Sequence, residues 1–218
     1  MNEPVPTFNA IDERALTEFR LSLGKRHFMS LEAYDPAATY NACATAHGWP
    51  TMCDPALVFE APEFADLLAI WRTAAEGGHV PLRSAFSARQ LKSHLPYITI
   101  YERFESDRGG YRYRVRLMGT AFAQVYGDLT GKVIDESVPA DMVPRFHVAI
   151  EQVLRARIPL RFVARVGMNG KNYLVAEYLM AQLADEQGNA MMVLCRAHFG
   201  SEAQIGPRQS IERHILSH

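Results

Sequence analysis

Cysteine is scarce in this sequence, and its spacing excludes two common uses of the residue. The 218 residues contain three cysteines, Cys43, Cys53 and Cys195. An odd, widely spaced set does not form the disulfide framework of a small secreted domain. Cys43, His47 and Cys53 lie close together, but no Cys-x-x-Cys pair and no clear fourth ligand accompany them, so we expect no metal site. Reduced thiols in a cytosol fit this pattern best.

An excess of charge of either sign is also missing. Lysine and arginine total 23 against 24 aspartates and glutamates, so no bulk charge attracts the chain to nucleic acid or to an anionic membrane. No apolar run approaches the roughly 18 residues that a membrane helix requires. The first residues lack the basic and apolar regions of a signal peptide. We therefore expect a soluble, cytoplasmic protein with no nucleic-acid or membrane partner.

Motifs for nucleotide binding and catalysis are absent as well. The stretch "GDLTGK" suggests a phosphate loop, but only three residues separate Gly127 from Gly131, and Val133 follows Lys132. A P-loop has four residues between its glycines, then Lys followed by Ser or Thr. No Gly-x-Ser-x-Gly elbow or His-Glu-x-x-His helix occurs. The sequence thus predicts neither a nucleotide site nor an enzyme.

The segment 1–62 has no sustained hydrophobic period. Asp12 can cap a short helix that Gly24 would end. Beyond that helix, several prolines and the Gly48-Trp49-Pro50 stretch interrupt any pattern, which favours an irregular arm. We therefore divide the chain into this helix and arm, a domain over 63–200, and a C-terminal tail over 201–218.

Periodicity within the domain predicts an α+β fold. Apolar residues from Phe64 to Trp71 share one helical face, and a longer amphipathic helix covers 142–156. Runs of strands separated by a helical block favour an antiparallel sheet with helices on one face. The five expected strands cover 96–104, 111–118, 159–166, 173–184 and 190–199.

An ordered series of motifs in 64–200 resembles a known family. It consists of a Pro-x-Arg, a Leu-Pro before the first strand, an Arg-x-x-x-x-Gly-Thr and a Tyr-Gly-x-x-x-Thr-Gly. The series is similar to the PAS-type sensor domain of short, single-domain alphaproteobacterial proteins. The matching residues are Trp71, Pro81, Arg83, Leu95, Pro96, Tyr113, Arg114, Gly119, Thr120, Gly127, Thr130 and Gly131.

The resemblance implies a five-stranded antiparallel sheet with helices over one face. Such a fold encloses either a small-ligand pocket or merely a core. Many PAS domains form homodimers through flanking helices, and they signal by binding partners rather than by catalysis. The cofactor stays unknown at this point.

The glycines of "GTAFAQVYGDLTGK" are expected to serve turns in this fold. Gly119 would let the chain turn sharply after the second strand, because glycine accepts backbone angles that other residues avoid. Gly127 and Gly131 would serve turns across the pocket mouth, and the Thr130 hydroxyl can bond back to the turn backbone.

Arginines form the main candidate interaction surface. Arg112, Arg114 and Arg116 share one face of the strand 111–118, where they can bind an acidic partner or an anionic metabolite. The alternative is a solvated or salt-bridged strand face, and Arg83 has the same two interpretations. Glu177, in an otherwise apolar strand, is a candidate counter-ion for an arginine, because burying it unpaired would be costly.

The candidate pocket lining consists of Phe122, Tyr126, Phe146 and His147. His147 lies on the apolar stripe of the long helix, where some PAS domains place a haem ligand, but a hydrogen-bonded core histidine is the commoner case. A photoreceptor flavin would need a reactive cysteine beside the pocket, and none occurs between Tyr111 and Ala156.

Two functions follow from these observations. The first is a non-catalytic PAS sensor or interaction module that binds a small ligand, a signalling partner or a second copy of itself. The alternative is a small-molecule enzyme or binding protein of cone-like α+β fold, with Asp128, Asp135 and His147 as loose acid and base candidates.

Overall fold

The computed structural model describes residues 34–107, 109–171, 173–201 and 205. The chain divides into two compact units, Met1–Tyr34 and Asp35–His218. All elements discussed below belong to the second unit. The helix expected after Asp12 and the turns expected near the C-terminus lie outside the described residues. Among the residues that are described, no helix combines the length and apolarity that crossing a bilayer requires.

One antiparallel sheet organises this unit. Its strand order is β1-β4-β5-β6-β2-β3. The five predicted strands and the α+β class are confirmed, but the sheet has a sixth strand, β1. The strands are β1 (Thr51–Asp54), β2 (Ile98–Glu105), β3 (Tyr111–Met118), β4 (Leu160–Arg165), β5 (Leu174–Leu183) and β6 (Met192–Ser201).

The sixth strand comes from a segment that we expected to be irregular. Asp35 caps helix α2 (Pro36–Ala46), its carboxylate accepting the backbone N–H groups of Ala37 and Ala38. Pro36 therefore begins a helix, the one helical position where proline is favoured, instead of breaking a pattern. After the Gly48 turn, β1 pairs with β4 from Thr51↔Ala164 to Asp54↔Arg161. Residues 35–54 are thus part of the fold rather than an arm.

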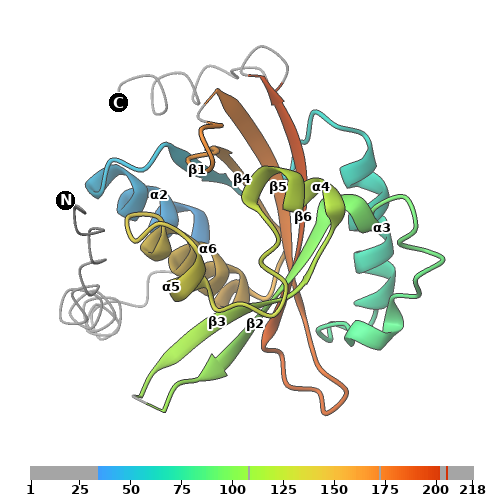
Figure 1. The fold of residues 1–218 in the computed structure, drawn as a ribbon. Helices are drawn as coiled ribbons and strands as arrows, with labels where there is room; N and C mark the ends of the chain where they lie inside the picture. The colour runs from blue at the N-terminus through green and yellow to red at the C-terminus, as the bar shows by residue number, and fades with distance from the viewer. Residues whose placement is uncertain (1–33, 108, 172, 202–204, 206–218) are drawn as a thin grey trace, which may run out of the picture. The chain divides into compact units, whose positions relative to one another are not determined.

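The helices lie on both faces of the sheet instead of on one (Figure 1). Helix α3 (Glu63–Ala74) covers one face, while α2 and α6 (Val143–Ala156) lie against the other. The short helices α4 (Thr120–Tyr126) and α5 (Ile134–Ser137) lie on the α6 side, where Phe122 of α4 contacts Tyr178 and Phe199. Two single 3-10 turns, Arg83–Ala85 and Leu95–Tyr97, precede β2.

The face under α3 is mainly aliphatic. Phe64, Leu67 and Trp71 of α3 pack on a cluster that includes Leu179 and Leu194 of the central strands. The Trp71 indole N–H donates to the Gln182 carbonyl at 2.9 Å, which satisfies the one polar atom of that ring. This half of the domain is a closed core that fixes α3 on the sheet.

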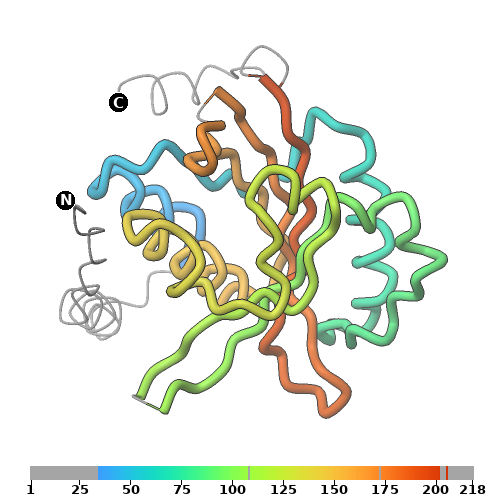
Figure 2. The backbone as a smooth tube through the Cα atoms, viewed as in Figure 1, coloured from blue at the N-terminus to red at the C-terminus, as the bar shows by residue number. Residues whose placement is uncertain are grey.

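Both edges of the sheet carry extra hydrogen bonds. At β1, the Asn41 amide donates to the Cys53 carbonyl at 2.9 Å and accepts the Cys53 N–H at 2.7 Å. At β3, the Val115 N–H donates to the Lys132 carbonyl and the Val115 carbonyl accepts the Gly131 N–H. Figure 2 shows the backbone of this loop beside the β2–β3 ribbon. The bonds occupy backbone groups that edge strands otherwise expose.

The "GDLTGK" stretch is this edge-covering loop. Gly127 and Gly131 have φ values of 79° and 78°, in the left-handed region that glycine tolerates best. Asp128 accepts the backbone N–H of Thr130 at 2.9 Å, while the role of the Thr130 hydroxyl stays a prediction. Hydrogen bonding to Thr130 holds the pKa of Asp128 below its usual range.

Gly119 is required for a different reason than the expected one. Its φ of −72° and ψ of 157° are ordinary extended angles. However, a Cβ atom here would lie 2.2 Å from the Leu95 carbonyl oxygen and 2.4 Å from that of Pro96. The close approach of two backbone segments, rather than an unusual angle, therefore demands glycine.

We expect Gly119→Ala to lower the free energy of unfolding by about 1–3 kcal/mol or more, because backbone must move to admit the methyl group. Urea denaturation measures the change. Gly167→Ala is the matched control, since its Cβ would meet Met142 Sδ at an ordinary 3.5 Å, and it should change stability by less than about 1 kcal/mol. Equal effects of the two changes would contradict the close-approach explanation.

Candidate functional site

A small cavity lies between the sheet and helices α2, α4 and α6. Its volume is about 50 Å³, room for roughly 3–5 water-sized groups. The walls are largely aromatic, and small side chains at Ala149 and Ala164 leave the space open. The lining residues are Tyr40, Thr51, Tyr101, Tyr126, Arg145, Phe146, Ala149, Phe162, Ala164, Tyr178, Met180 and Cys195.

Arg145 places a cation at this cavity. The residue belongs to the first turn of α6 and is only 9% exposed. Its guanidinium donates to the Arg165 carbonyl at a long 3.4 Å, and no carboxylate among the described residues pairs with it. A buried cation without a counter-ion is costly, so the position of Arg145 calls for an explanation.

Four tyrosines, Tyr40, Tyr101, Tyr126 and Tyr178, also line the cavity. The hydroxyls of Tyr126 and Tyr178 are in direct hydrogen-bond contact. Thr51 donates to the Val163 carbonyl at 3.0 Å, so the Tyr40 hydroxyl donates to Thr51 Oγ1 at 3.1 Å. No described residue forms a side-chain hydrogen bond with the Tyr101 hydroxyl. The cavity is therefore apolar in its walls but has hydrogen-bonding groups at defined positions.

The ionisable groups that line the cavity are poor acid–base catalysts. Burial raises the pKa of Tyr40, Tyr101, Tyr126 and Tyr178, so these phenols stay protonated at neutral pH. Burial also raises the pKa of the Cys195 thiol, which disfavours the thiolate that a nucleophile needs. The lining contains no Asp, Glu or His among the described residues. This chemistry suits binding rather than turnover.

The four expected pocket residues are not all at the cavity. Tyr126 and Phe146 line it. Phe122 packs behind them, stacked on Tyr126 with ring centroids 5.9 Å apart. His147 points elsewhere, toward Tyr113 and Asp135. The ligand-binding roles of these residues stay predictions.

His147 and Arg112 share the carboxylate of Asp135. His147 Nε2 lies 2.9 Å from Asp135 Oδ1, an ion-pair distance at which the ring N–H is not aligned with the oxygen. Arg112 Nε donates to Asp135 Oδ2 at 3.1 Å. Burial opposes ionisation of Asp135, but these two partners outweigh it and lower its pKa. The cluster ties α5, α6 and β3 together, outside the cavity.

The arginine face of β3 is paired. Arg114 and Arg116 donate to the two oxygens of Glu102 at 2.6 and 2.9 Å, and Arg112 also reaches Glu136 at 2.8 Å. Both arginines on Glu102 are about half exposed, so each pair contributes little to stability. The salt-bridged alternative thus describes the arrangement, and binding of a partner here stays a prediction. Arg83 is exposed, and no described carboxylate pairs with it.

Glu177 is an arginine's counter-ion on the α3 face of the sheet, the face away from the cavity. The carboxylate is fully buried, and Arg161 Nε donates to it at 2.6 Å. Arg161 also donates to Asp54 at 2.9 Å, while Glu177 accepts the Glu60 N–H at 3.2 Å. The network therefore ties the segment before α3 to β4 and β5. Its arginine comes from β4 rather than from the β3 face.

The cysteine and histidine group near the N-terminal helix does not assemble a metal site. Cys43 Sγ lies 3.7 Å from His47 Nδ1. Cys53 is buried in β1, where burial raises its thiol pKa to about 12. Within the described part of the chain, no three His, Cys, Asp or Glu side chains come together as metal ligands.

The family of the chain follows from its sequence. Residues 59–196 match the family described as a PAS domain. Because the match covers more than half of the sequence, the chain belongs to the PAS domain family. A PAS domain is consistent with a sensor or interaction module, and the six-stranded antiparallel sheet with its helices agrees with this assignment.

Other comparisons add little. A solved structure titled "Structure of an RNA-binding Light-Oxygen-Voltage Receptor" aligns with 11% identity and a TM-score of 0.37. The alignment covers 63% of this chain and 38% of that one. At this similarity, neither RNA binding nor light sensing transfers to the present chain. No sequence among the curated proteins matches it.

Sequence reasoning missed the polar residues of the cavity. Arg145 stands among apolar residues at the start of α6, and Tyr40 and Thr51 lie in the segment taken as an arm. One available signal was the Asp35-Pro36 pair, which is a helix start of the same kind as Pro62. Recognising α2 would have placed Tyr40 on a buried helical face.

We expect Asp135→Asn to lower the free energy of unfolding at pH 7 by about 1–3 kcal/mol, because the charged hydrogen bond from Arg112 is lost. The folded-state pKa of Asp135 lies below the unfolded value of about 3.9. Its contribution is therefore present above that pH and disappears as pH falls through the folded pKa. Urea denaturation at pH 3, 5 and 7 measures this difference.

The matched control is Glu136→Gln, which also removes a partner of Arg112 but at a site that is 64% exposed. This variant should change stability by less than about 1 kcal/mol. A stability loss in Asp135→Asn that does not change with pH would show that the carboxylate charge is not responsible.

Removing Glu177 should be strongly destabilising. We expect Glu177→Leu to cost about 3 kcal/mol, because Arg161 then stays buried with only Asp54 as partner. The double variant Arg161→Met, Glu177→Leu should recover most of this loss, since two apolar side chains replace the pair. A double-mutant cycle in urea measures the coupling, and strictly additive losses would contradict it.

Proposed function

We propose that this chain is a non-catalytic sensory PAS domain that holds a small molecule in the cavity between the sheet and α6. The observation that carries the proposal is the cavity itself, where a buried guanidinium and tyrosine hydroxyls face an otherwise aromatic space. A few well-placed polar groups in an apolar pocket are typical of a small-molecule site.

The position of the cavity supports a signalling role. A bound molecule would contact β4, β5 and β6 on one side and α2 and α6 on the other. Binding would therefore change the packing of α2 and α6 on the sheet, and a ligand shifts such an equilibrium by its differential affinity for the two arrangements. A homodimer or a signalling protein would read this change, as the resemblance to short single-domain PAS proteins of alphaproteobacteria suggests.

Catalysis is disfavoured by the chemistry of the same residues. An acid–base mechanism needs a group whose pKa lies near neutral pH and that reaches the substrate. The tyrosines and Cys195 at the cavity have raised pKa values, and the Asp135–His147 pair is not among the lining residues. The cone-like enzyme alternative therefore has no observation in its favour.

Occupation of the cavity should stabilise the protein. We expect at least one member of a panel of molecules with two to five non-hydrogen atoms, both anionic and neutral, to raise the Tm of the wild type. A ligand at about 100 times its Kd contributes about 2.7 kcal/mol. Differential scanning fluorimetry with each compound measures the shift.

The matched variants are Ala164→Val, which fills the cavity from β4, and Ala190→Val, which makes the same change on a partly exposed site near the β5–β6 turn. The Tm shift should disappear in Ala164→Val and persist in Ala190→Val. If no compound of either charge class shifts the wild-type Tm, the sensory-ligand proposal is wrong.

A further inference from the structure

The cavity presents hydrogen-bond donors without matching acceptors. Arg145 contributes a guanidinium, which can only donate. In the hydrogen bond between Tyr126 and Tyr178, one hydroxyl donates its proton and the other accepts it. The accepting hydroxyl can therefore donate its own proton to a ligand. The Tyr101 hydroxyl has no side-chain hydrogen-bond partner among the described residues. A complementary molecule must therefore supply acceptors.

We propose that the ligand of this cavity is a short-chain monocarboxylate, with Arg145 as its counter-ion. The inference rests on the proposed function, because it names the class of molecule that the same cavity would bind. A carboxylate supplies two acceptor oxygens and one negative charge, which match the guanidinium fork and the adjacent hydroxyl donors.

The burial of Arg145 is the strongest argument for an anion. The side chain is about nine-tenths buried, and its hydrogen bond to a described residue is the 3.4 Å contact with the Arg165 carbonyl. By contrast, the buried Arg161 has two carboxylate partners at 2.6 and 2.9 Å on the other face of the same sheet. A bound carboxylate would give Arg145 the pairing that Arg161 already has.

The size and charge of the cavity select the class of anion. Arg145 is the only cation among the described residues that line it, so one negative charge is balanced and a doubly charged phosphate is not. A volume of about 50 Å³ admits only a few heavy atoms. Phe146, Phe162 and Met180 supply apolar contacts for a short alkyl chain. Acetate and propionate are therefore suitable probes.

The test compares acetate and propionate with the neutral isosteres acetamide and propionamide. Isothermal titration at constant ionic strength should show binding of the carboxylates to the wild type. Arg145→Gln should weaken that binding by about 10–100-fold, the effect of losing a charged hydrogen bond. Tyr101→Phe keeps the shape of the cavity and should weaken binding less.

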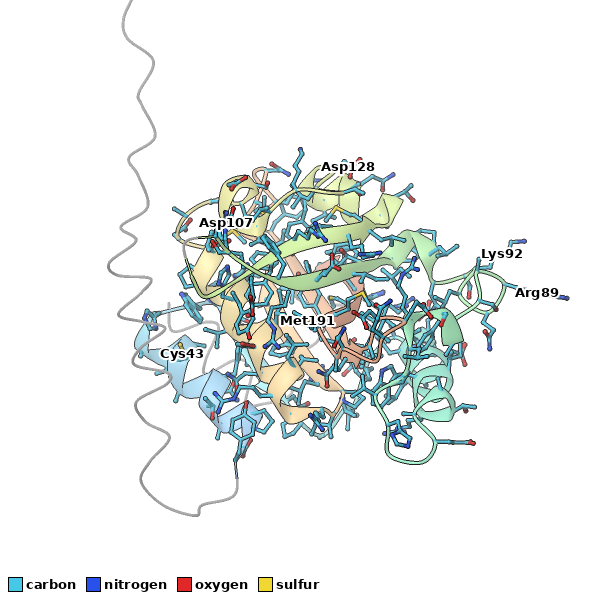
Figure 3. The ribbon with its side chains drawn as sticks, turned by 90° about the horizontal axis from the view of Figure 1, so that it is seen from below. Cys43, Arg89, Lys92, Asp107, Asp128 and Met191 are labelled. Atoms are coloured by element: carbon cyan, nitrogen blue, oxygen red, sulfur yellow. The ribbon has the colours of Figure 1, made fainter. Side chains whose placement is uncertain are left out.

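Arg89→Gln is the matched control for loss of a cation. Arg89 is exposed on the turn before β2, and Figure 3 shows its side chain extending away from the domain beside Lys92. This variant should bind carboxylates as the wild type does. An equal loss in both arginine variants would overturn the assignment of Arg145 as counter-ion.

Stability without ligand provides a second, independent measurement. Because Arg145 is an uncompensated buried cation in the empty cavity, Arg145→Gln should unfold at a Tm equal to or above that of the wild type in carboxylate-free buffer. A large decrease in Tm would show a structural role and overturn the inference.

The outcomes separate the two proposals. If the amides bind as tightly as the carboxylates and Arg145→Gln has no effect, the anion inference is wrong but the cavity still binds small molecules. If no molecule of either charge class binds the wild type, both the inference and the proposed function are wrong.

Discussion

The antiparallel pairing of β5 with β6 is the constraint on which the rest of the domain depends. The ladder runs without interruption from Leu174↔Ser201 to Leu183↔Met192 at the centre of the sheet. Because successive residues of a strand point to opposite faces, it sends Tyr178 to the cavity and its neighbour Glu177 to the α3 side. A shift of the strand register by one residue would place Glu177 at the cavity and Tyr178 under α3. The site and the closed core are therefore specified together.

The two faces solve the problem of polar groups in different ways. Under α3, the ionic groups of Arg161 and Glu177 neutralise each other inside a closed packing. Under α6, rings and hydroxyls replace aliphatic chains, and the small residues Ala149 and Ala164 leave room beside Arg145. Arg196 is also buried under α3 without a carboxylate partner in the described part of the chain, but its guanidinium lies over the Phe64 ring and bonds to His94. Arg145 differs from it in lining a cavity.

Local patterns predicted most of the fold but little of the site. Alternation and turn residues located five strands, and helical periodicity located α3 and α6. The short β1 has only four residues and no pattern, so its presence depends on pairing with β4, a contact over a hundred residues away. Arg145 is buried only because α2 and the sheet surround the start of α6. Such burial results from tertiary packing, and the hydrophobic periodicity of a single helix does not predict it. Gly119 shows the same limit, since its neighbours Leu95 and Pro96 come from another segment.

The covered edges of the sheet restrict how another protein can recognise this domain. Asn41 occupies the outward backbone groups of Cys53 at β1, and the loop before α5 occupies those of Val115 at β3. A partner strand would have to displace these bonds before it could extend the ladder. A partner is thus expected to recognise side chains on the helices and sheet faces rather than the backbone. Side chains differ between proteins, whereas all chains share the same backbone. Occupied backbone groups at Cys53 and Val115 therefore favour selectivity that depends on the surface side chains.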